Sequence, residues 1–162
     1  MDDKQVNSPP KSSFKLRPSA GSMIHAASRH SGLRILHVDD DPNQLMFTKF
    51  FLEECDPGLS VESVSVPLDV VAVIEEEEYD CVVSDYQMDD MDGVTLTRRL
   101  RERSDIPIII YTGRGSDEVE EVARAAGADG YVRKEMDPHH YLGLYSQIRQ
   151  AVEEKLQALI KK

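Results

Sequence analysis

The chain has 162 residues, of which 40% are hydrophobic and 30% are charged, and its formal net charge at pH 7 is −11. This length suits one domain, and the composition excludes a fibrous or wholly disordered protein. No apolar run approaches the roughly 20 residues of a membrane span and no segment resembles a signal peptide, so we expect a cytoplasmic protein without membrane contact. Two cysteines, Cys55 and Cys81, are too few for a disulfide framework or a four-ligand zinc site, and we expect both to be buried.

Charge divides the chain into two parts. Residues 1–33 hold five basic and two acidic residues, so 14 basic and 28 acidic residues remain and give the rest a net charge of −14. Residues 1–32 are also rich in serine and proline and lack hydrophobic periodicity, which predicts a flexible tail before a folded domain at 33–162. Because phosphate backbones repel a domain this acidic, we expect no direct nucleic-acid binding.

In the folded part, short apolar runs alternate with helical patterns. The first run ends in three aspartates, and Pro42 follows as the first residue of a helix capped by Asp41. The apolar side of this helix is expected to comprise Leu45, Met46, Phe50 and Leu52. Five strands are predicted at 34–38, 61–64, 80–84, 106–111 and 129–132, and five helices at 42–54, 67–78, 93–103, 117–126 and 138–160.

This alternation predicts a doubly wound α/β fold, in which five parallel strands are flanked by five helices. The ligand site of such a fold lies outside the carboxyl ends of its strands. Four of the predicted strands carry polar residues there: Asp39 to Asp41 after the first, Asp85 after the third, Thr112 with Gly113 after the fourth, and Lys134 after the fifth. We therefore expect these side chains to meet at one edge of the sheet.

Their chemistry favours a magnesium ion and a phosphoryl group. Carboxylates gathered within a few ångström repel one another, and a hard divalent cation relieves that repulsion. Oxygen ligands without histidine or cysteine favour Mg²⁺ over zinc. A hydroxyl and an ammonium that face a metal-bound carboxylate suit the oxygens of a phosphoryl group.

The strand ends also carry the motifs of a known family. From Arg34 to about Gln150 the chain resembles the receiver domain of two-component response regulators, and the YTGRG and DYQM variants are similar to those of archaeal receivers. The motifs are ILHVDDDP at 35–42, VVSDYQMDDMDG at 82–93, IIIYTGRG at 108–115 and AGADGYVRK at 126–134. The resemblance implies the flavodoxin-like receiver fold, here as a single-domain, chemotaxis-regulator-like protein.

The resemblance also implies a role for each site residue. Asp85 matches the phosphoacceptor, Thr112 the hydroxyl that turns toward the phosphoryl group, and Lys134 the lysine that pairs with it. Tyr131 matches the aromatic switch residue that becomes buried as this hydroxyl turns. The implied Mg²⁺ ligands are Asp40 directly, Asp39 through water, Asp85, and the backbone carbonyl of Gln87.

The implied function is His-to-Asp phosphorelay signalling. A sensor histidine kinase or phosphotransfer protein would supply the phosphoryl group, and the domain would catalyse its own phosphorylation and slow dephosphorylation without acting as an enzyme on other substrates. Gln87 and Arg114 would flank the route of the hydrolytic water. Phosphorylation would switch a surface formed by 117–126, 129–132 and 138–150. That face would bind a downstream protein or form a homodimer, because no effector domain follows the last helix.

Two positions depart from the family pattern. Asp89 replaces a proline in the loop after the third strand and makes that loop strongly acidic. Glu135 replaces the proline that normally follows the lysine in a cis peptide. A cis bond before another residue type costs about 2.5–4 kcal/mol, so we predict a trans bond between Lys134 and Glu135.

Two other functions remain as alternatives. One is a small Mg²⁺-dependent phosphatase of the haloacid-dehalogenase type, which also uses an Asp-x-Asp motif after its first strand. Pro42 and Asn43 follow the aspartates here, where that motif continues differently. The other is a phosphorylation-independent protein-binding module of the receiver fold. Phosphoryl uptake from acetyl phosphate with Mg²⁺ distinguishes this module from a phosphoacceptor.

Overall fold

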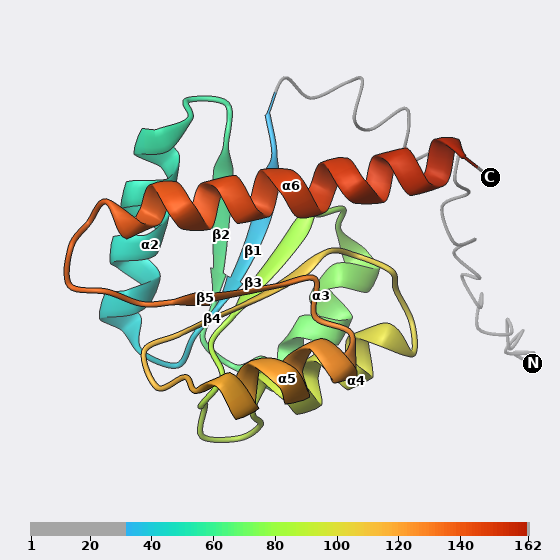
Figure 1. The fold of residues 1–162 in the computed structure, drawn as a ribbon, viewed down its shortest axis with the longest axis horizontal. Helices are drawn as coiled ribbons and strands as arrows, with labels where there is room; N and C mark the ends of the chain where they lie inside the picture. Colours follow the sequence, from blue (N-terminus) through green and yellow to red (C-terminus); the bar gives the residue numbers. More distant parts are fainter. Residues whose placement is uncertain (1–31, 162) are drawn as a thin grey trace, which may run out of the picture.

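The computed structural model describes residues 32–161, so the predicted tail at 1–32 lies outside the described residues except for Gly32. Five strands and five α-helices alternate along the chain, as the sequence predicts (Figure 1). The strands are β1 (Arg34–Val38), β2 (Ser60–Val64), β3 (Cys81–Ser84), β4 (Ile108–Thr112) and β5 (Gly130–Arg133). The helices are α2 (Pro42–Cys55), the 3₁₀ turn η1 (Pro67–Asp69), α3 (Val70–Glu76), α4 (Gly93–Arg101), α5 (Asp117–Ala126) and α6 (His140–Ile160).

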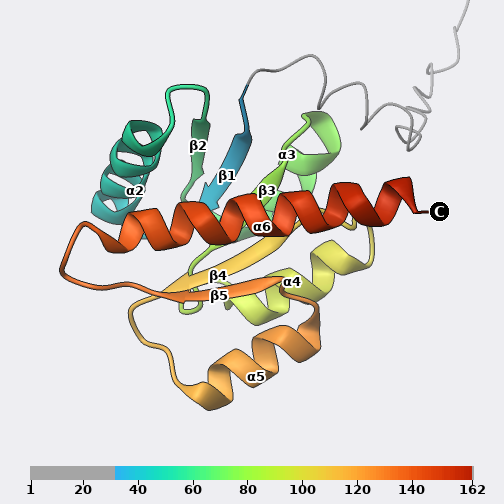
Figure 2. The same cartoon turned by 45° about the horizontal axis from the view of Figure 1, so that its top comes forward.

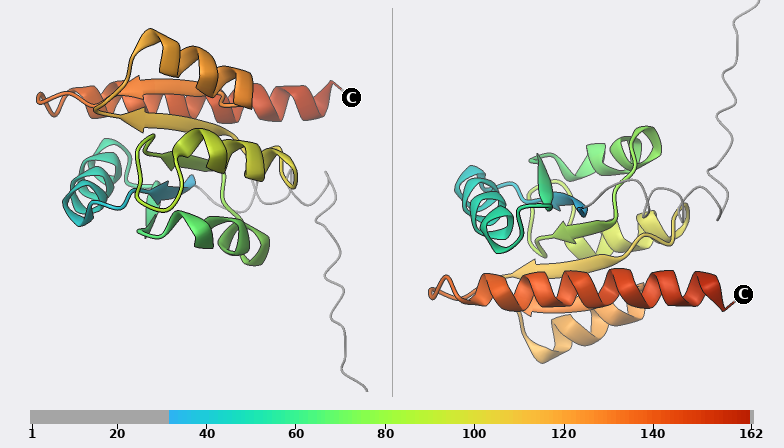
Figure 3. Two further views of the ribbon diagram at one scale, coloured as in Figure 1. Left: turned by 90° about the horizontal axis from the view of Figure 1, so that it is seen from below. Right: turned by 90° about the horizontal axis from the view of Figure 1, so that it is seen from above.

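The strands form one parallel sheet in the order β2-β1-β3-β4-β5. Helices α2 and α6 cover one face, where they pack on a core that includes Ile35, Val83 and Ile109. The opposite face packs against α3, α4 and α5 (Figures 1 and 2). Helix α6 runs antiparallel to the strands and projects beyond their amino ends (Figure 3).

Several element boundaries differ from the predicted ones. Strand β4 begins at Ile108 because Pro107 has no N–H to give to a neighbouring strand. The helix predicted from Pro67 begins as the turn η1 and becomes α-helical only at Val70. Helix α4 ends at Arg101, two residues early, and α6 begins at His140 rather than at Pro138.

The predicted apolar side of α2 is wrong in part. Leu52 is fully buried, as expected, but Met46 and Phe50 are each 58% exposed. The fully buried Thr48 lies one turn before Leu52 and takes the inward position instead. Met46, Phe47 and Phe50, which we call the α2 apolar patch, therefore face outward.

The structure also places the two cysteines and the peptide bond after Lys134. Cys81 is buried, as expected, whereas Cys55 is only half-buried, because it is the last residue of α2; both are free thiols. No peptide bond within 32–161 is cis, so the predicted trans bond after Lys134 is confirmed. None of the helices in that range is long and apolar enough to cross a membrane.

Candidate functional site

Two aspartates are held at the carboxyl end of β1. The Asp39 N–H donates to the Val64 carbonyl of β2 at 3.2 Å, and its side chain is 1% exposed. Asp39 Oδ1 accepts from the Asp41 N–H at 2.9 Å, while the Asp41 carboxylate caps α2 through the Asn43 N–H. Helix capping by Asp41 therefore leaves Asp39 and Asp40 to form the site.

The third carboxylate comes from β3, which neighbours β1. The Asp85 N–H donates to the Val38 carbonyl at 2.9 Å, which extends the parallel ladder by one residue and fixes the position of Asp85. Carboxylate oxygens of Asp39, Asp40 and Asp85 all lie within 4.8 Å of one another. The three aspartates predicted to meet at this edge do so.

One lysine faces the three carboxylates. Lys134 Nζ lies 2.7 Å from Asp39 Oδ2 and 3.7 Å from Asp85 Oδ1. The Lys134 backbone N–H donates to the Thr112 carbonyl at 2.9 Å, so the ends of β4 and β5 are joined where both residues meet the site. One positive charge against three carboxylates leaves an excess of negative charge in a partly buried place.

The pKa of Asp85 responds to this environment. Burial raises the pKa of its carboxyl group above the usual value, Lys134 opposes this shift, and the charge of Asp39 raises the pKa further. A cation that approached these oxygens would relieve the repulsion. All the donors are oxygens, which suits Mg²⁺, and Asp39, Asp40 and Asp85 are the residues that could hold it.

The loop that follows β3 closes over Asp40. The Asp89 N–H donates to Asp40 Oδ2 at 3.0 Å. Proline, which the family pattern has at this position, could not make this hydrogen bond because it has no N–H. Sequence reasoning noted the acidic character of Asp89 but missed this contact, whose donor is a backbone group.

Gln87 and Arg114 meet across the mouth of the site. Arg114 Nη1 donates to Gln87 Oε1 at 3.3 Å, so the amide is engaged by the guanidinium. The Arg114 N–H also donates to Thr112 Oγ1 at 3.2 Å, and Thr112 itself is 1% exposed. The metal-ligand role of the Gln87 backbone carbonyl stays a prediction.

Tyr131 lies inward, beside the loop that follows β4. Its side chain is 9% exposed, and its hydroxyl has no hydrogen-bond partner within the described chain. A Cβ atom on Gly115 would come within 1.7 Å of the Tyr131 hydroxyl and within 3.3 Å of Thr112 Cγ2. Glycine at 115 is therefore what allows Tyr131 to pack beside Thr112, a requirement that the sequence analysis did not identify.

The chain is similar to known proteins over most of its described residues. The family model described as "Response regulator receiver domain" matches residues 35–145. The chain is 33% identical over 107 residues to the uncharacterized transcriptional regulatory protein YclJ of Bacillus subtilis, which covers 65% of this chain and 46% of that protein. It is 33% identical over 122 residues to the cyclic di-GMP phosphodiesterase response regulator RpfG of Xanthomonas campestris, covering 74% and 32%. The chain thus spans less than half the length of these relatives.

Solved structures have the same fold. A CheY-like receiver domain protein from Methanospirillum hungatei superposes with a TM-score of 0.66 at 32% identity, covering 76% of this chain and 99% of that one. The chemotaxis response regulator CheY4 of Vibrio cholerae superposes with a TM-score of 0.65 at 24% identity, covering 73% and 99%. The second match supports the fold alone.

Proposed function

The chain belongs to the receiver domains of response regulators, and from this premise we propose that Asp85 accepts a phosphoryl group from a phosphohistidine, with Mg²⁺ held by Asp39, Asp40, Asp85 and the Gln87 carbonyl. The observation that carries the proposal is the cluster of Asp39, Asp40 and Asp85 within 4.8 Å, with Lys134 Nζ between Asp39 and Asp85. Neither the phosphatase nor the phosphorylation-independent module is favoured by this family membership.

The proposed reaction is an in-line displacement at phosphorus. An oxygen of the Asp85 carboxylate forms the new P–O bond while the P–N bond of the donor breaks, and the imidazole leaves with the bonding electron pair. Bound Mg²⁺ would neutralise charge on the transferred oxygens. Lys134 lies 3.7 Å from Asp85 Oδ1 and supplies a second positive charge, and the buried Thr112 hydroxyl donates to a phosphoryl oxygen once the group has arrived.

We place the phosphodonor on the side of the site where α2 begins. The α2 apolar patch consists of Met46, Phe47 and Phe50, which are 58%, 47% and 58% exposed. Helix α2, which carries them, begins two residues after Asp40. Exposed apolar side chains are suited to docking a protein partner. A sensor histidine kinase or phosphotransfer protein is the partner class proposed, with its phosphohistidine directed at Asp85.

Output is proposed to leave through the face made by α5, β5 and α6. Val122 and Leu142 are exposed on this face, and Arg133 pairs with Asp117 across it at 3.0 Å. Tyr131 links the face to Thr112 because both side chains pack against Gly115. A change at Thr112 on phosphorylation would therefore reach a surface suited to a downstream protein or a symmetric dimer.

The test is phosphoryl uptake followed by intact mass spectrometry. The chain is incubated with Mg²⁺ and acetyl phosphate, and we expect one acid-labile phosphoryl group, which Asp85→Asn abolishes. Asp80→Asn is the matched control: Asp80 lies at the other end of β3 and accepts from the Arg34 N–H at 2.7 Å, so its loss should leave uptake unchanged. Phosphorylation of Asp85→Asn would refute the assignment.

A further inference from the structure

The aromatic side chain that precedes Thr112 lies under the site lysine. Lys134 Nζ is 5.2 Å from the centroid of the Tyr111 ring. Tyr111 is fully buried and belongs to the face of the sheet that α2 and α6 cover. An ammonium over an aromatic face at this distance gains a cation–π attraction, which is strongest where water is excluded. The ring thus contacts the cation that pairs with Asp39 and Asp85.

The Tyr111 ring is itself held in place from the start of α6. Its hydroxyl lies 2.5 Å from His140 Nε2, and His140 Nδ1 lies 2.7 Å from the backbone carbonyl of Asp137. A carbonyl only accepts, so Nδ1 carries the proton, and the Nε2 of a neutral imidazole accepts from the tyrosine hydroxyl. Burial raises the pKa of Tyr111, which keeps this hydroxyl protonated and able to donate.

Through these contacts, both ends of the segment from Lys134 to His140 lie against the Tyr111 ring. Lys134 meets the ring face, and His140, the first residue of α6, binds the hydroxyl and stacks on the ring with centroids 5.8 Å apart. His37 and Tyr141 pack around the same ring at 6.3 Å and 6.2 Å. A ring held from several sides is a rigid support, whereas a lysine side chain alone has many rotamers.

We propose that Tyr111 is a positioning residue for phosphoryl transfer: its ring holds the Lys134 ammonium in place between Asp39 and Asp85, and His140 fixes the ring. The inference rests on the proposed function, since it assigns Tyr111 a part in phosphorylation of Asp85. Tyr111 makes no contact with the phosphoryl group itself. It acts only through the position of Lys134.

The first test is the rate of phosphorylation by acetyl phosphate with Mg²⁺ in a double-mutant cycle. Tyr111→Met replaces the ring with an unbranched apolar side chain that can still fill the buried space. Because the ring face is lost, we expect phosphorylation to be about tenfold slower. Tyr111→Phe removes the hydroxyl–imidazole hydrogen bond and keeps the ring, and His140→Ala removes that hydrogen bond together with the stacking on the ring. Each should slow the reaction about two- to threefold. In a Lys134→Gln background, Tyr111→Met should add less than about a twofold effect, because the cation it positions is gone.

The second test does not depend on phosphorylation. In ¹³C-lysine-labelled protein the Lys134 signals, identified by their loss in Lys134→Gln, should show an upfield ring-current shift in the wild type and in Tyr111→Phe. The shift should vanish in Tyr111→Met. If Tyr111→Met does not fold, Tyr111→Leu takes its place in both tests.

Distinct results would overturn the inference. A tenfold effect of Tyr111→Met that persists in the Lys134→Gln background would show a structural role alone, as would Tyr111→Phe being as slow as Tyr111→Met. Unshifted Lys134 signals in the wild type would exclude the ring contact. A wild-type chain that took up no phosphoryl group would overturn the proposed function and this inference together, whereas uptake with an additive cycle would overturn the inference alone.

Discussion

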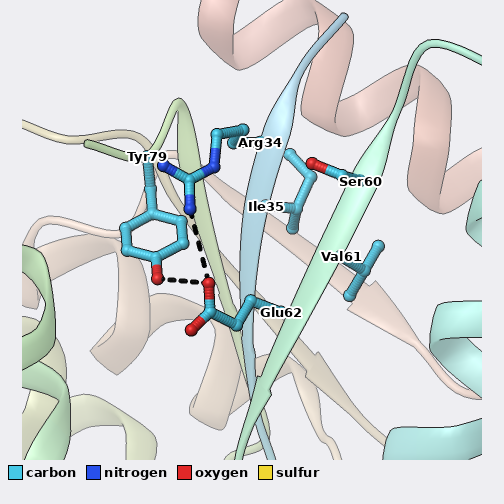
Figure 4. A pocket seen from close by; sticks show the side chains of 6 residues that line it. All are labelled: Arg34, Ile35, Ser60, Val61, Glu62 and Tyr79. Atoms are coloured by element: carbon cyan, nitrogen blue, oxygen red, sulfur yellow. Dashed lines mark hydrogen bonds and ion pairs between the residues drawn. The ribbon is translucent and has the colours of Figure 1, made fainter. Parts of the chain in front are cut away.

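The two ends of the sheet are built from the same kinds of group but balance their charges differently. At the amino end, Arg34 bonds Glu77 at 2.8 Å and Glu62 at 3.4 Å, and its guanidinium lies 4.8 Å from the centroid of the Tyr79 ring. The Tyr79 hydroxyl donates to Glu62 at 2.6 Å (Figure 4). These ion-pair partners are 36–54% exposed, so solvent also screens them.

At the carboxyl end, charge is both buried and in excess. Asp39, Asp40 and Asp85 lie together, and Lys134 pairs with Asp39 and Asp85. The side chains of Asp39 and Lys134 are 1% and 15% exposed. A hollow of about 280 Å³ lies at the amino end, but the charged groups around it are already paired. A paired, solvated network of charges stabilises the fold, whereas a buried surplus of one charge prepares a site for a ligand of the opposite charge.

Removing a carboxylate from each end of the sheet should have the largest and most unequal effects on Mg²⁺ binding. Asp40→Ala is expected to weaken Mg²⁺ binding and to lower phosphorylation at limiting Mg²⁺ by about a hundredfold, the upper range for losing a group that supports a metal site. Glu62→Gln, at the amino end, should leave both unchanged. Isothermal titration with Mg²⁺ and the phosphorylation rate at several Mg²⁺ concentrations measure this. Wild-type affinity in Asp40→Ala would remove Asp40 from the metal site.

The middle of β1 offers a third environment. His37 is fully buried, neither of its ring nitrogens has a partner in the part of the chain that the structure describes, and burial, helped by Lys134, lowers its pKa to about 3. The folded state therefore resists protonation of His37 relative to the unfolded chain. Above the unfolded-state pKa near 6.5, His37 is neutral in both states and does not change the free energy of unfolding with pH. As the pH falls from there toward 3, the unfolded chain takes up the proton first, so the free energy of unfolding decreases.

We expect the free energy of unfolding to fall by about 2–3 kcal/mol between about pH 6.5 and pH 4.5 because of His37. His37→Leu should flatten the pH dependence over that range and stabilise the chain by about 1–2 kcal/mol at neutral pH, since the unpaired buried nitrogens are gone. Urea denaturation of both proteins at several pH values measures the difference. The same slope in both would show that His37 is not the group responsible.

Neutralising one carboxylate at each end should shift stability in opposite directions. In metal-free buffer at pH 7, Asp85→Asn should raise the unfolding free energy by about 1 kcal/mol, or about 3 °C in midpoint, because it removes a buried charge whose pKa is raised. Glu62→Gln should lower it by about 0.5–1 kcal/mol, because Arg34 loses a partner. Thermal unfolding measures whether each variant is more or less stable than the wild type. If both variants shifted in the same direction, the two ends of the sheet would not differ in charge balance as described.

The smallest expected effect concerns the mouth of the site. Arg114 holds the Gln87 amide at 3.3 Å, so the amide is not free to orient water. The acyl phosphate of Arg114→Ala should therefore hydrolyse about threefold faster. A rate change of this size corresponds to the free energy of one weak hydrogen bond. Loss of phosphate after removal of the donor measures the rate. A slower loss would mean that Arg114, rather than Gln87, promotes hydrolysis.

Most of the site could be predicted because its residues are fixed by strand ends. A parallel sheet brings the residue after each strand to one edge, so Asp39, Asp85 and Lys134 meet although up to 95 residues separate them. The contacts of Tyr111 could not be predicted in this way. In the sequence it is one apolar position in the run 106–111, and its partners depend on how α6 begins.

The side of α2 that faces the core was also beyond the sequence pattern. Apolar residues surround much of this helix, so periodicity alone could not decide which of them turn inward. The burial of Thr48 follows from the packing of α2 against β2, α6 and β1, not from its polarity. The Asp89 contact with Asp40 was missed for a related reason, because a backbone donor leaves no mark in the sequence.

The excess negative charge at the carboxyl end of the sheet surrounds one carboxylate that we propose to be reactive, that of Asp85. Borohydride reduction of the phosphorylated chain converts an acyl phosphate to an alcohol, so peptide mass mapping locates the modified residue. We predict conversion at Asp85 and at no other aspartate or glutamate. Conversion at Asp39, Asp40 or any residue at the amino end of the sheet would show that Asp85 is not the phosphoacceptor.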